Sequence, residues 1–243
     1  LKTPLYNFAV VVDDYEMEIS HVIRGEDHIS NTPKQILMQK ALNFDQPIYA
    51  HLPLILAPDR TKLSKRHSAV SIAEYREQGY LPEALINFMV LLGWNSGRDQ
   101  EIFTLSSLVK EFSLERIQKS GAVLNIQKLN FINSFYIREK TTEKLTELCL
   151  PYLISAKLIE KYSGGYKILE TEEEILLVTL QKIIEAYKSR LKKLSEISEL
   201  TDFFFKEKLD YQKEMLKWQQ MSDKDAMDSL LASEKILSGI KNW

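Results

Sequence analysis

A basic pentapeptide, Lys62-Leu63-Ser64-Lys65-Arg66, is the feature that most constrains this chain. It follows the turn signal Pro58-Asp59-Arg60, and a compact cluster with two acidic residues, Arg24-Gly25-Glu26-Asp27-His28, lies upstream. Lysine ammonium groups act as point charges on phosphate oxygens, and an arginine offers a planar fork that binds two oxygens at once. A flexible cationic loop that follows an acidic one therefore predicts a site where a polyphosphate is held and cleaved.

A short basic run is by itself more often a solvated loop, so its surroundings must decide. The run resembles the KMSKS signature loop of class I aminoacyl-tRNA synthetases, in the KLSKR form common in glutamyl-tRNA synthetases. Other segments resemble the same family in the same order along nearly the whole chain. They are YNFAVVVDD (6–14), HVIRGEDHISNTP (21–33), GYLPEAL (79–85), LLGW (91–94) and DFFF (202–205).

Composition excludes several classes of protein. The chain has 243 residues, of which 44% are hydrophobic, enough for one large or two ordinary domains with apolar cores. Its one cysteine, Cys149, can build neither a disulfide framework nor a cysteine-based zinc site, which favours a reducing, cytoplasmic setting. We expect no membrane partner, because no apolar run approaches spanning length. The net charge of -2 requires any nucleic-acid contact to be a local patch.

The expected fold is α/β plus all-α. The resemblance implies that residues 1–66 are the C-terminal half of a Rossmann-like catalytic domain with the KLSKR loop. It further implies a helical stem-contact or connecting domain over residues 67–137 and an α-helical anticodon-binding region over residues 138–243. No HIGH-type signature surrounds any histidine, and the chain starts at Leu1. We therefore expect a fragment that lacks the N-terminal half of the enzyme and is inactive alone, with a C-terminus that is also truncated.

Local patterns predict individual elements. Residues 4–12 suit a strand or one helical face, whereas residues 19–23 and 51–56 predict short strands, the second peripheral because it carries Pro53. Thr32 is a candidate helix cap with Gln35 in a capping box. Further helix starts are expected at Ser71, Pro82, Thr104, Ser113, Asn125 and Thr171, and a turn at 163–165.

The activity implied by the resemblance is that of a glutamate–tRNA ligase. ATP would activate L-glutamate to glutamyl-adenylate, and the glutamyl group would then pass to the 3′ end of tRNA(Glu). Mg²⁺ is expected with the ATP, and no protein-bound metal is expected in this segment. The partners would be tRNA(Glu), L-glutamate and ATP, with the enzyme acting as a monomer.

Lys65 is the first candidate for contact with the leaving phosphates and Lys62 the second, because such contacts strengthen as charge builds on pyrophosphate. The resemblance implies that Asp27 contacts the ATP ribose. Leu54 and Ile55 would pack on adenine in the strand before the loop, although an ordinary core strand is nearly as good a reading. The full ATP-binding set is Asp27, Leu54, Ile55, Lys62, Leu63, Ser64, Lys65 and Arg66.

Arg24 is the candidate ligand of a glutamate carboxylate, because a guanidinium at a strand end is a natural fork for one. The alternative is a surface salt bridge to Glu26 or Asp27. By resemblance Tyr6 lies against the amino-acid substrate, and Val10 falls one helical turn further along the same face. Tyr6, Val10 and Arg24 are thus the expected glutamate-binding residues.

Arg190, Lys192 and Lys193 are the candidate tRNA-binding residues, on the same predicted helical stretch as Lys182 and Lys188. They would contact the backbone without reading sequence, and a solvated helix face is the alternative. The three phenylalanines at 203–205 are expected in the core rather than as a base-stacking platform.

Three rival functions remain open from the sequence. A glutamyl transferase that modifies a tRNA base lacks the helical C-terminal region, and a glutaminyl-tRNA synthetase carries β-barrels there, so residues 138–243 count against both. A non-catalytic tRNA-binding module would describe the chain if it acts alone.

Overall fold

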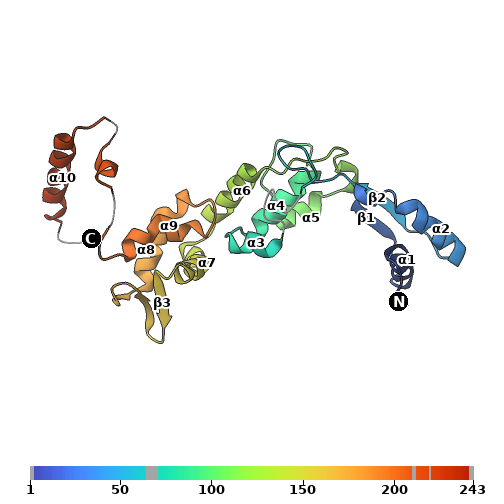
Figure 1. The fold of residues 1–243 in the computed structure, drawn as a ribbon, viewed down its shortest axis with the longest axis horizontal. Helices are drawn as coiled ribbons and strands as arrows, with labels where there is room; N and C mark the ends of the chain where they lie inside the picture. Colours follow the sequence, from blue (N-terminus) through green and yellow to red (C-terminus); the bar gives the residue numbers. More distant parts are fainter. Residues whose placement is uncertain (1–2, 64–70, 210–211, 219, 241–243) are drawn as a thin grey trace.

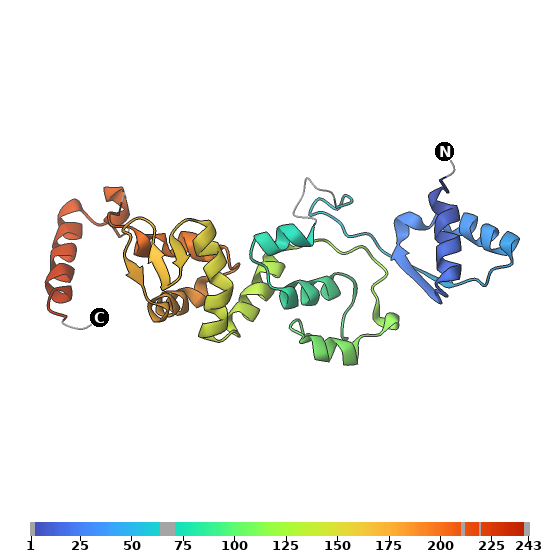
Figure 2. The same cartoon turned by 90° about the horizontal axis from the view of Figure 1, so that it is seen from below.

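The computed structural model describes residues 3–63, 71–209, 212–218 and 220–240. It is elongated, with an N-terminal α/β unit at one end, helices in the middle, and a C-terminal unit that ends in a separate helix (Figure 1). Figure 2 shows the light-blue segment after the second strand leading from the α/β unit to the helical middle. Within the described ranges, no helix is long and apolar enough to cross a membrane.

The N-terminal unit pairs two parallel strands and flanks them with helices. Its elements are α1 (Tyr6–Glu16), β1 (His21–Gly25), η1 (Glu26–His28), α2 (Thr32–Leu42) and β2 (Ile48–Leu52). Residues 6–16 are helical and bury Val11, which settles the ambiguity over residues 4–12. The strand predicted over 19–23 exists as β1. The strand predicted over 51–56 has wrong bounds, because β2 begins at Ile48 and ends before Pro53.

Helix α2 begins differently from the prediction. Its N-cap is Asn31, which makes no side-chain capping bond, and Thr32 is the first helical residue. The predicted cap at Thr32 is therefore wrong. The Thr32 hydroxyl and the Gln35 side chain accept hydrogen bonds from Arg24 instead, because a partly buried guanidinium needs hydrogen-bond acceptors.

The helical middle confirms most of the predicted starts. It comprises α3 (Ile72–Glu77), α4 (Pro82–Gly93), α5 (Leu105–Glu111), η2 (Leu114–Arg116) and α6 (Ile126–Arg138). Ser71, Thr104 and Asn125 are N-caps whose side chains accept the backbone N–H three residues on. Pro82 opens α4 and Gly93 closes it, as their backbone preferences favour.

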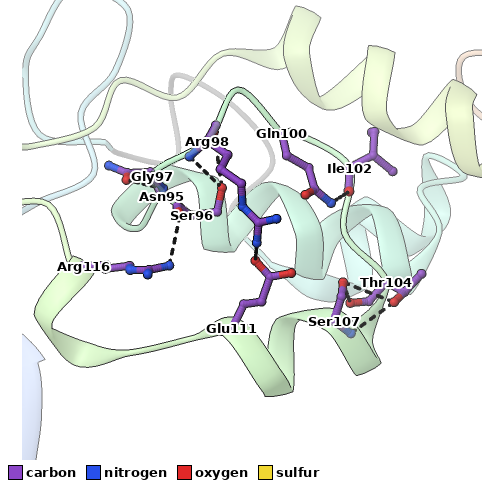
Figure 3. Close-up of polar contacts among 10 residues, drawn as sticks. All are labelled: Asn95, Ser96, Gly97, Arg98, Gln100, Ile102, Thr104, Ser107, Glu111 and Arg116. Atoms are coloured by element: carbon purple, nitrogen blue, oxygen red, sulfur yellow. Dashed lines mark hydrogen bonds and ion pairs between the residues drawn. The ribbon is translucent and has the colours of Figure 1, made fainter.

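The loop between α4 and α5 is held by its own polar contacts (Figure 3). Arg98 donates to Glu111 of α5 over 2.5 Å, and Arg116 donates to the carbonyl of Ser96 over 2.9 Å. Below the loop, the buried side chain of Asn87 accepts from the Phe103 N–H at 2.9 Å and donates to the Glu101 carbonyl at 2.8 Å. The bonds of Arg116 and Asn87 satisfy backbone groups that no helix or strand pairs.

The C-terminal unit is helical apart from a small sheet. Its elements are α7 (Thr142–Ser155), β3 (Ile159–Tyr162), β4 (Gly165–Ile168), β5 (Glu174–Ile175), α8 (Leu177–Tyr187), η3 (Lys188–Arg190), α9 (Glu196–Thr201), η4 (Asp202–Phe205), η5 (Lys213–Leu216) and α10 (Asp223–Leu237). The three strands are antiparallel in the order β3-β4-β5. The sequence reading missed this sheet, although it placed the turn at 163–165 that joins β3 to β4.

The predicted helix start at Thr171 is wrong for a related reason. Glu174 and Ile175 pair with β4, so α8 begins only at Leu177. Regularly spaced apolar residues in and after α8 nevertheless belong to the core. Leu180 and Ile184 on α8 and Leu191 after it are fully buried in the main core, and α8 contacts α7 and α9. The spacing of apolar residues over 176–194 fits either one long helix or a broken pair, and the structure has the break, because α8 ends at Tyr187 and η3 follows it.

Candidate active site

Arg24 of β1 is held by two residues of α2 and by one of β2. Its Nη2 donates to Thr32 Oγ1 and to Gln35 Oε1, each over 2.8 Å. Gln35 is fully buried and its own Nε2 donates to Asn7 of α1 over 2.9 Å. The guanidinium carbon lies 5.3 Å from the centroid of the Tyr49 ring, a cation–π distance. These contacts fix the guanidinium by neutral groups alone.

Among the described residues no carboxylate forms an ion pair with Arg24, and its buried Nε has no hydrogen-bond acceptor. Its charge acts only at a distance on Asp14, where burial raises the pKa of the carboxyl and Arg24 partly opposes that rise. The two carboxylates expected as alternative partners are engaged elsewhere: Glu26 accepts the Leu54 N–H at 3.1 Å, and Asp27 pairs with Lys62. The surface salt-bridge reading of Arg24 is therefore wrong. A half-buried guanidinium with unused donors favours an anion at this position.

Tyr6 stands on α1 beside the loop that follows β1. Its hydroxyl lies 3.3 Å from His28 Nδ1, and its side chain remains half exposed. Val10, one turn further along α1, is half-buried. Asn31 contacts the same His28 nitrogen at 3.4 Å, so the loop is braced from two sides. Tyr6 thus offers a hydroxyl that is only loosely engaged.

A hairpin follows the segment that contains Leu54 and Ile55. The Leu63 N–H donates to the Ile55 carbonyl over 3.1 Å, and Leu56 and Lys62 form an antiparallel bridge. The predicted turn closes it: Arg60 has a left-handed φ of 64°, and Asp59 accepts the Thr61 N–H at 3.0 Å. The predicted site residues Ser64, Lys65 and Arg66 lie outside the described residues.

Lys62 brings the hairpin to the acidic loop. Its Nζ lies 3.1 Å from Asp27 Oδ2, and the two side chains are 62% and 41% exposed. The hydrogen bond from Lys62 is the main cause that lowers the pKa of the Asp27 carboxyl below its ordinary value. An exposed pair of this kind is weak because water screens it. Lys62 can therefore exchange its partner for a more negative ligand.

Residues 121–124 anchor the hairpin from the helical middle, a contact that the sequence reading missed. The Leu56 N–H donates to the Ala122 carbonyl at 2.9 Å, and the Leu124 N–H donates to the Leu56 carbonyl at 2.8 Å. A Cβ at Gly121 would lie only 2.9 Å from the Leu54 carbonyl oxygen. The signal in the sequence is a lone glycine between two helices, which marks close backbone approach.

Leu54 and Ile55 lie after β2 rather than in it. Together with Met89, Trp94 and Phe112 they line an apolar cavity of about 340 Å³. The backbone N–H of Leu54 is taken by Glu26, whereas Ile55 keeps a 42% exposed side chain. In the part of the chain that is described, no group of three or more His, Cys, Asp or Glu side chains is placed to hold a metal ion.

The predicted tRNA-binding residues do not share a helix. Arg190 belongs to η3, and Lys192 and Lys193 lie in the turn after it, where Glu196 accepts both of their backbone N–H groups. Lys188, expected beside them, is only 17% exposed and donates to the Lys140 carbonyl. The common helical stretch is thus wrong, while Arg190 and Lys192 remain exposed.

Comparisons with known proteins fall on both halves of the chain. Residues 1–131 match the family described as tRNA synthetases class I (E and Q), catalytic domain, and residues 144–243 match the anticodon binding domain. Glutamate–tRNA ligase 1 of Caldicellulosiruptor saccharolyticus is 48% identical over 90% of this chain. The corresponding ligase of Carboxydothermus hydrogenoformans is 47% identical over 87%.

A solved structure agrees with these matches. The glutamate tRNA ligase of Elizabethkingia meningosepticum, crystallised with its amino acid, covers 98% of this chain with a TM-score of 0.73 and 29% identity. The chain spans less than half the length of each of these relatives: 44% and 42% of the two ligases and 48% of the crystallised chain.

Proposed function

Because this chain belongs to the family of class I tRNA synthetases for glutamate and glutamine, we propose that the protein carrying it is a glutamate–tRNA ligase. The proposal rests chiefly on the catalytic-domain match over residues 1–131, together with relatives at 44–48% identity that bear this name. The protein would use ATP to convert L-glutamate into glutamyl-adenylate, and then transfer the glutamyl group to tRNA(Glu).

The chain would divide this work among three segments. Residues 1–66 would supply part of the catalytic domain, residues 67–137 would connect it and contact the tRNA stem, and residues 138–243 would bind the anticodon region. The match of residues 144–243 to an anticodon binding domain supports the last of these roles.

Arg24 would bind a carboxylate of glutamate. Thr32 and Gln35 leave its Nε and part of its Nη donors unused, and fix the plane of the guanidinium before the substrate arrives. Such preorganisation lowers the entropy lost on binding. Tyr6 would donate its hydroxyl to the same substrate, and Val10 would complete the wall on the next turn of α1.

Activation would begin when a carboxylate oxygen of glutamate attacks the α-phosphorus of ATP. The new C–O–P linkage forms as the bond to the β-phosphate breaks, and pyrophosphate leaves with the negative charge. Lys62 and Lys65 would neutralise that charge, with Leu63, Ser64 and Arg66 completing the loop around the phosphates. Lys62 would leave Asp27 to do so, and Asp27 would then be free to accept a ribose hydroxyl.

The remaining ATP contacts would come from the segment before the hairpin. Leu54 and Ile55 would pack against adenine, and Mg²⁺ would enter bound to the ATP phosphates. In the second step a hydroxyl of the terminal adenosine of tRNA attacks the glutamyl carbonyl, and AMP leaves. Arg190, Lys192 and Lys193 would hold the tRNA backbone. The enzyme would act as a monomer in a reducing cytoplasm.

Neither rival enzyme gains support from these observations. A transferase that modifies a tRNA base would not need residues 144–243, which match an anticodon binding domain. The family itself includes glutamine enzymes, so the choice between glutamate and glutamine rests on the relatives' names.

Transfer of labelled amino acid to tRNA tests the proposal. The whole protein that carries this chain should attach glutamate to tRNA(Glu) in the presence of ATP, and should leave glutamine unused at equal concentration. Attachment of glutamine, or no attachment of glutamate under conditions where the folded protein binds ATP, would contradict the proposed function.

A further inference from the structure

We propose that Phe203 and Phe204, together with Tyr187 and Arg190, form a platform on which an unpaired base of the bound RNA stacks. The inference rests on the proposed function, and it names the part of the RNA that this face would take. It also revises the expectation that Phe203, Phe204 and Phe205 all belong to the core.

The short helix η4 (Asp202–Phe205) separates the three phenylalanines. Phe205 is 2% exposed and packs in the core, whereas Phe203 is 39% and Phe204 43% exposed. Only three residues make a turn of a 3₁₀-helix, so consecutive side chains point in widely different directions. Phe203 and Phe204 therefore do not share the buried direction of Phe205, and both remain at the surface.

The exposed rings are arranged as one aromatic cluster. Phe203 and Phe204 lie with ring centroids 4.4 Å apart at an interplanar angle of 31°. Tyr187, the last residue of α8, meets Phe203 edge-on at 6.3 Å and Phe204 at 6.1 Å. The edge contacts hold the pair from one side. The rings are thus positioned before any ligand arrives, while much of their surface remains open to solvent.

A cation without an acidic partner lies on the same cluster. The guanidinium carbon of Arg190 is 5.3 Å from the Tyr187 ring centroid, and within the described ranges Arg190 makes no ion pair. The acidic residue closest in sequence to the rings, Asp202, is already paired with Lys206. The face therefore combines open ring surface with a positive charge that forms no ion pair among the described residues.

This combination fits a nucleotide better than an apolar peptide. Bases stack on aromatic side chains and on arginine planes, and the adjoining phosphate carries the charge that Arg190 would meet. An apolar peptide would use the rings but leave the guanidinium unpaired. Paired bases have both faces covered within their helix, so the platform would select an unpaired base.

Phe203→Leu and Phe204→Leu test the platform in the full chain, because leucine keeps apolar volume but removes the ring. The probes are a labelled RNA hairpin with the anticodon stem and loop of tRNA(Glu), and a fully paired duplex of the same stem. We expect each leucine variant to bind the hairpin about tenfold or more weakly. The leucine variants should bind the duplex as the wild type does, and the melting temperature of the protein should change little. Phe204→Tyr should bind the hairpin like the wild type.

Salt dependence separates the rings from the charge. Arg190→Ala should reduce the slope of log affinity against log salt by about one, whereas the leucine variants should leave that slope unchanged. Leucine variants that bind the hairpin as tightly as the wild type would overturn the stacking platform but leave the proposed function standing. A wild-type chain that binds neither the hairpin nor whole tRNA(Glu) would overturn the proposed tRNA contact as well.

Discussion

The buried side chain of Asn133 donates a hydrogen bond to the carbonyl of Lys192 over 2.6 Å. The same amide accepts the N–H of Leu81 at 2.8 Å. Asn133 lies on α6, Leu81 precedes α4, and Lys192 lies in the turn that carries candidate tRNA contacts. One fully buried side chain therefore joins the segment that leads away from the basic hairpin to the C-terminal unit.

Asn133→Ala should destabilise the chain by about 2 kcal/mol, because it leaves the buried Leu81 N–H and the Lys192 carbonyl without their partner. Urea unfolding of variant and wild type measures the difference. Gln127→Ala is the matched control, since Gln127 is exposed on the same helix and should change stability by less than about 0.5 kcal/mol. If Asn133→Ala destabilised the chain no more than Gln127→Ala does, the hydrogen bonds of Asn133 would not contribute to stability.

Gly121→Ala should weaken ATP binding and lower stability by about 1–3 kcal/mol, because the new methyl group meets the Leu54 carbonyl and the Leu56 side chain. Gly93→Ala is the control, as a Cβ there would meet nothing within 4 Å. Thermal unfolding and nucleotide titration measure the two effects. A Gly121→Ala variant that matches Gly93→Ala in both would mean that the hairpin does not depend on this close approach.

Arg24→Ala should raise the KM for glutamate by about 10- to 150-fold and leave ATP affinity nearly unchanged, because a charged hydrogen-bonded contact contributes roughly 1.5–3 kcal/mol. Steady-state kinetics of the whole protein provide the measurement. Arg24→Lys should restore only part of the affinity, since lysine cannot form the planar fork. Glutamate affinity that is equal in Arg24→Ala and wild type would remove Arg24 from the binding site.

The Asp27–Lys62 pair predicts a pH effect with a definite sign. The pKa of Asp27 is lowered in the folded state, so the pair is present at neutral pH and is lost as pH falls through that lowered pKa, below 3.8. In Lys62→Ala the pKa of Asp27 should rise toward 3.8, as carboxyl chemical shifts would show. Lys34→Ala, which removes another exposed lysine, should not shift it.

Several of these residues could be located from the sequence because their signals are local. Pro82 and Gly93 set the ends of α4, Ser71 and Asn125 cap helices, and the turn at residues 58–60 closes the hairpin. Each of these outcomes depends on backbone preferences within a few residues of chain. Arg24 could likewise be chosen from its place at the end of a strand, whereas its partners depend on tertiary contacts that the sequence does not show.

Long-range contacts account for what the sequence reading missed. Thr32 and Gln35 read as a capping box, yet they serve a guanidinium that lies on β1. Glu174 read as the first turn of a helix, but it pairs with a strand. Phe203 and Phe204 are indistinguishable from Phe205 in composition, and only the packing of η4 decides which ring is buried. In each case tertiary structure overrides a local preference.

The central claim is that the basic hairpin neutralises the leaving pyrophosphate during glutamate activation, and Lys65→Ala tests it most directly. Glutamate-dependent ATP–pyrophosphate exchange should be measured in the whole protein with tRNA(Glu) present, for this variant and the wild type. The account predicts a kcat lowered by about 100-fold with a glutamate KM that changes little, because the contact strengthens only in the transition state. An unchanged kcat would contradict it.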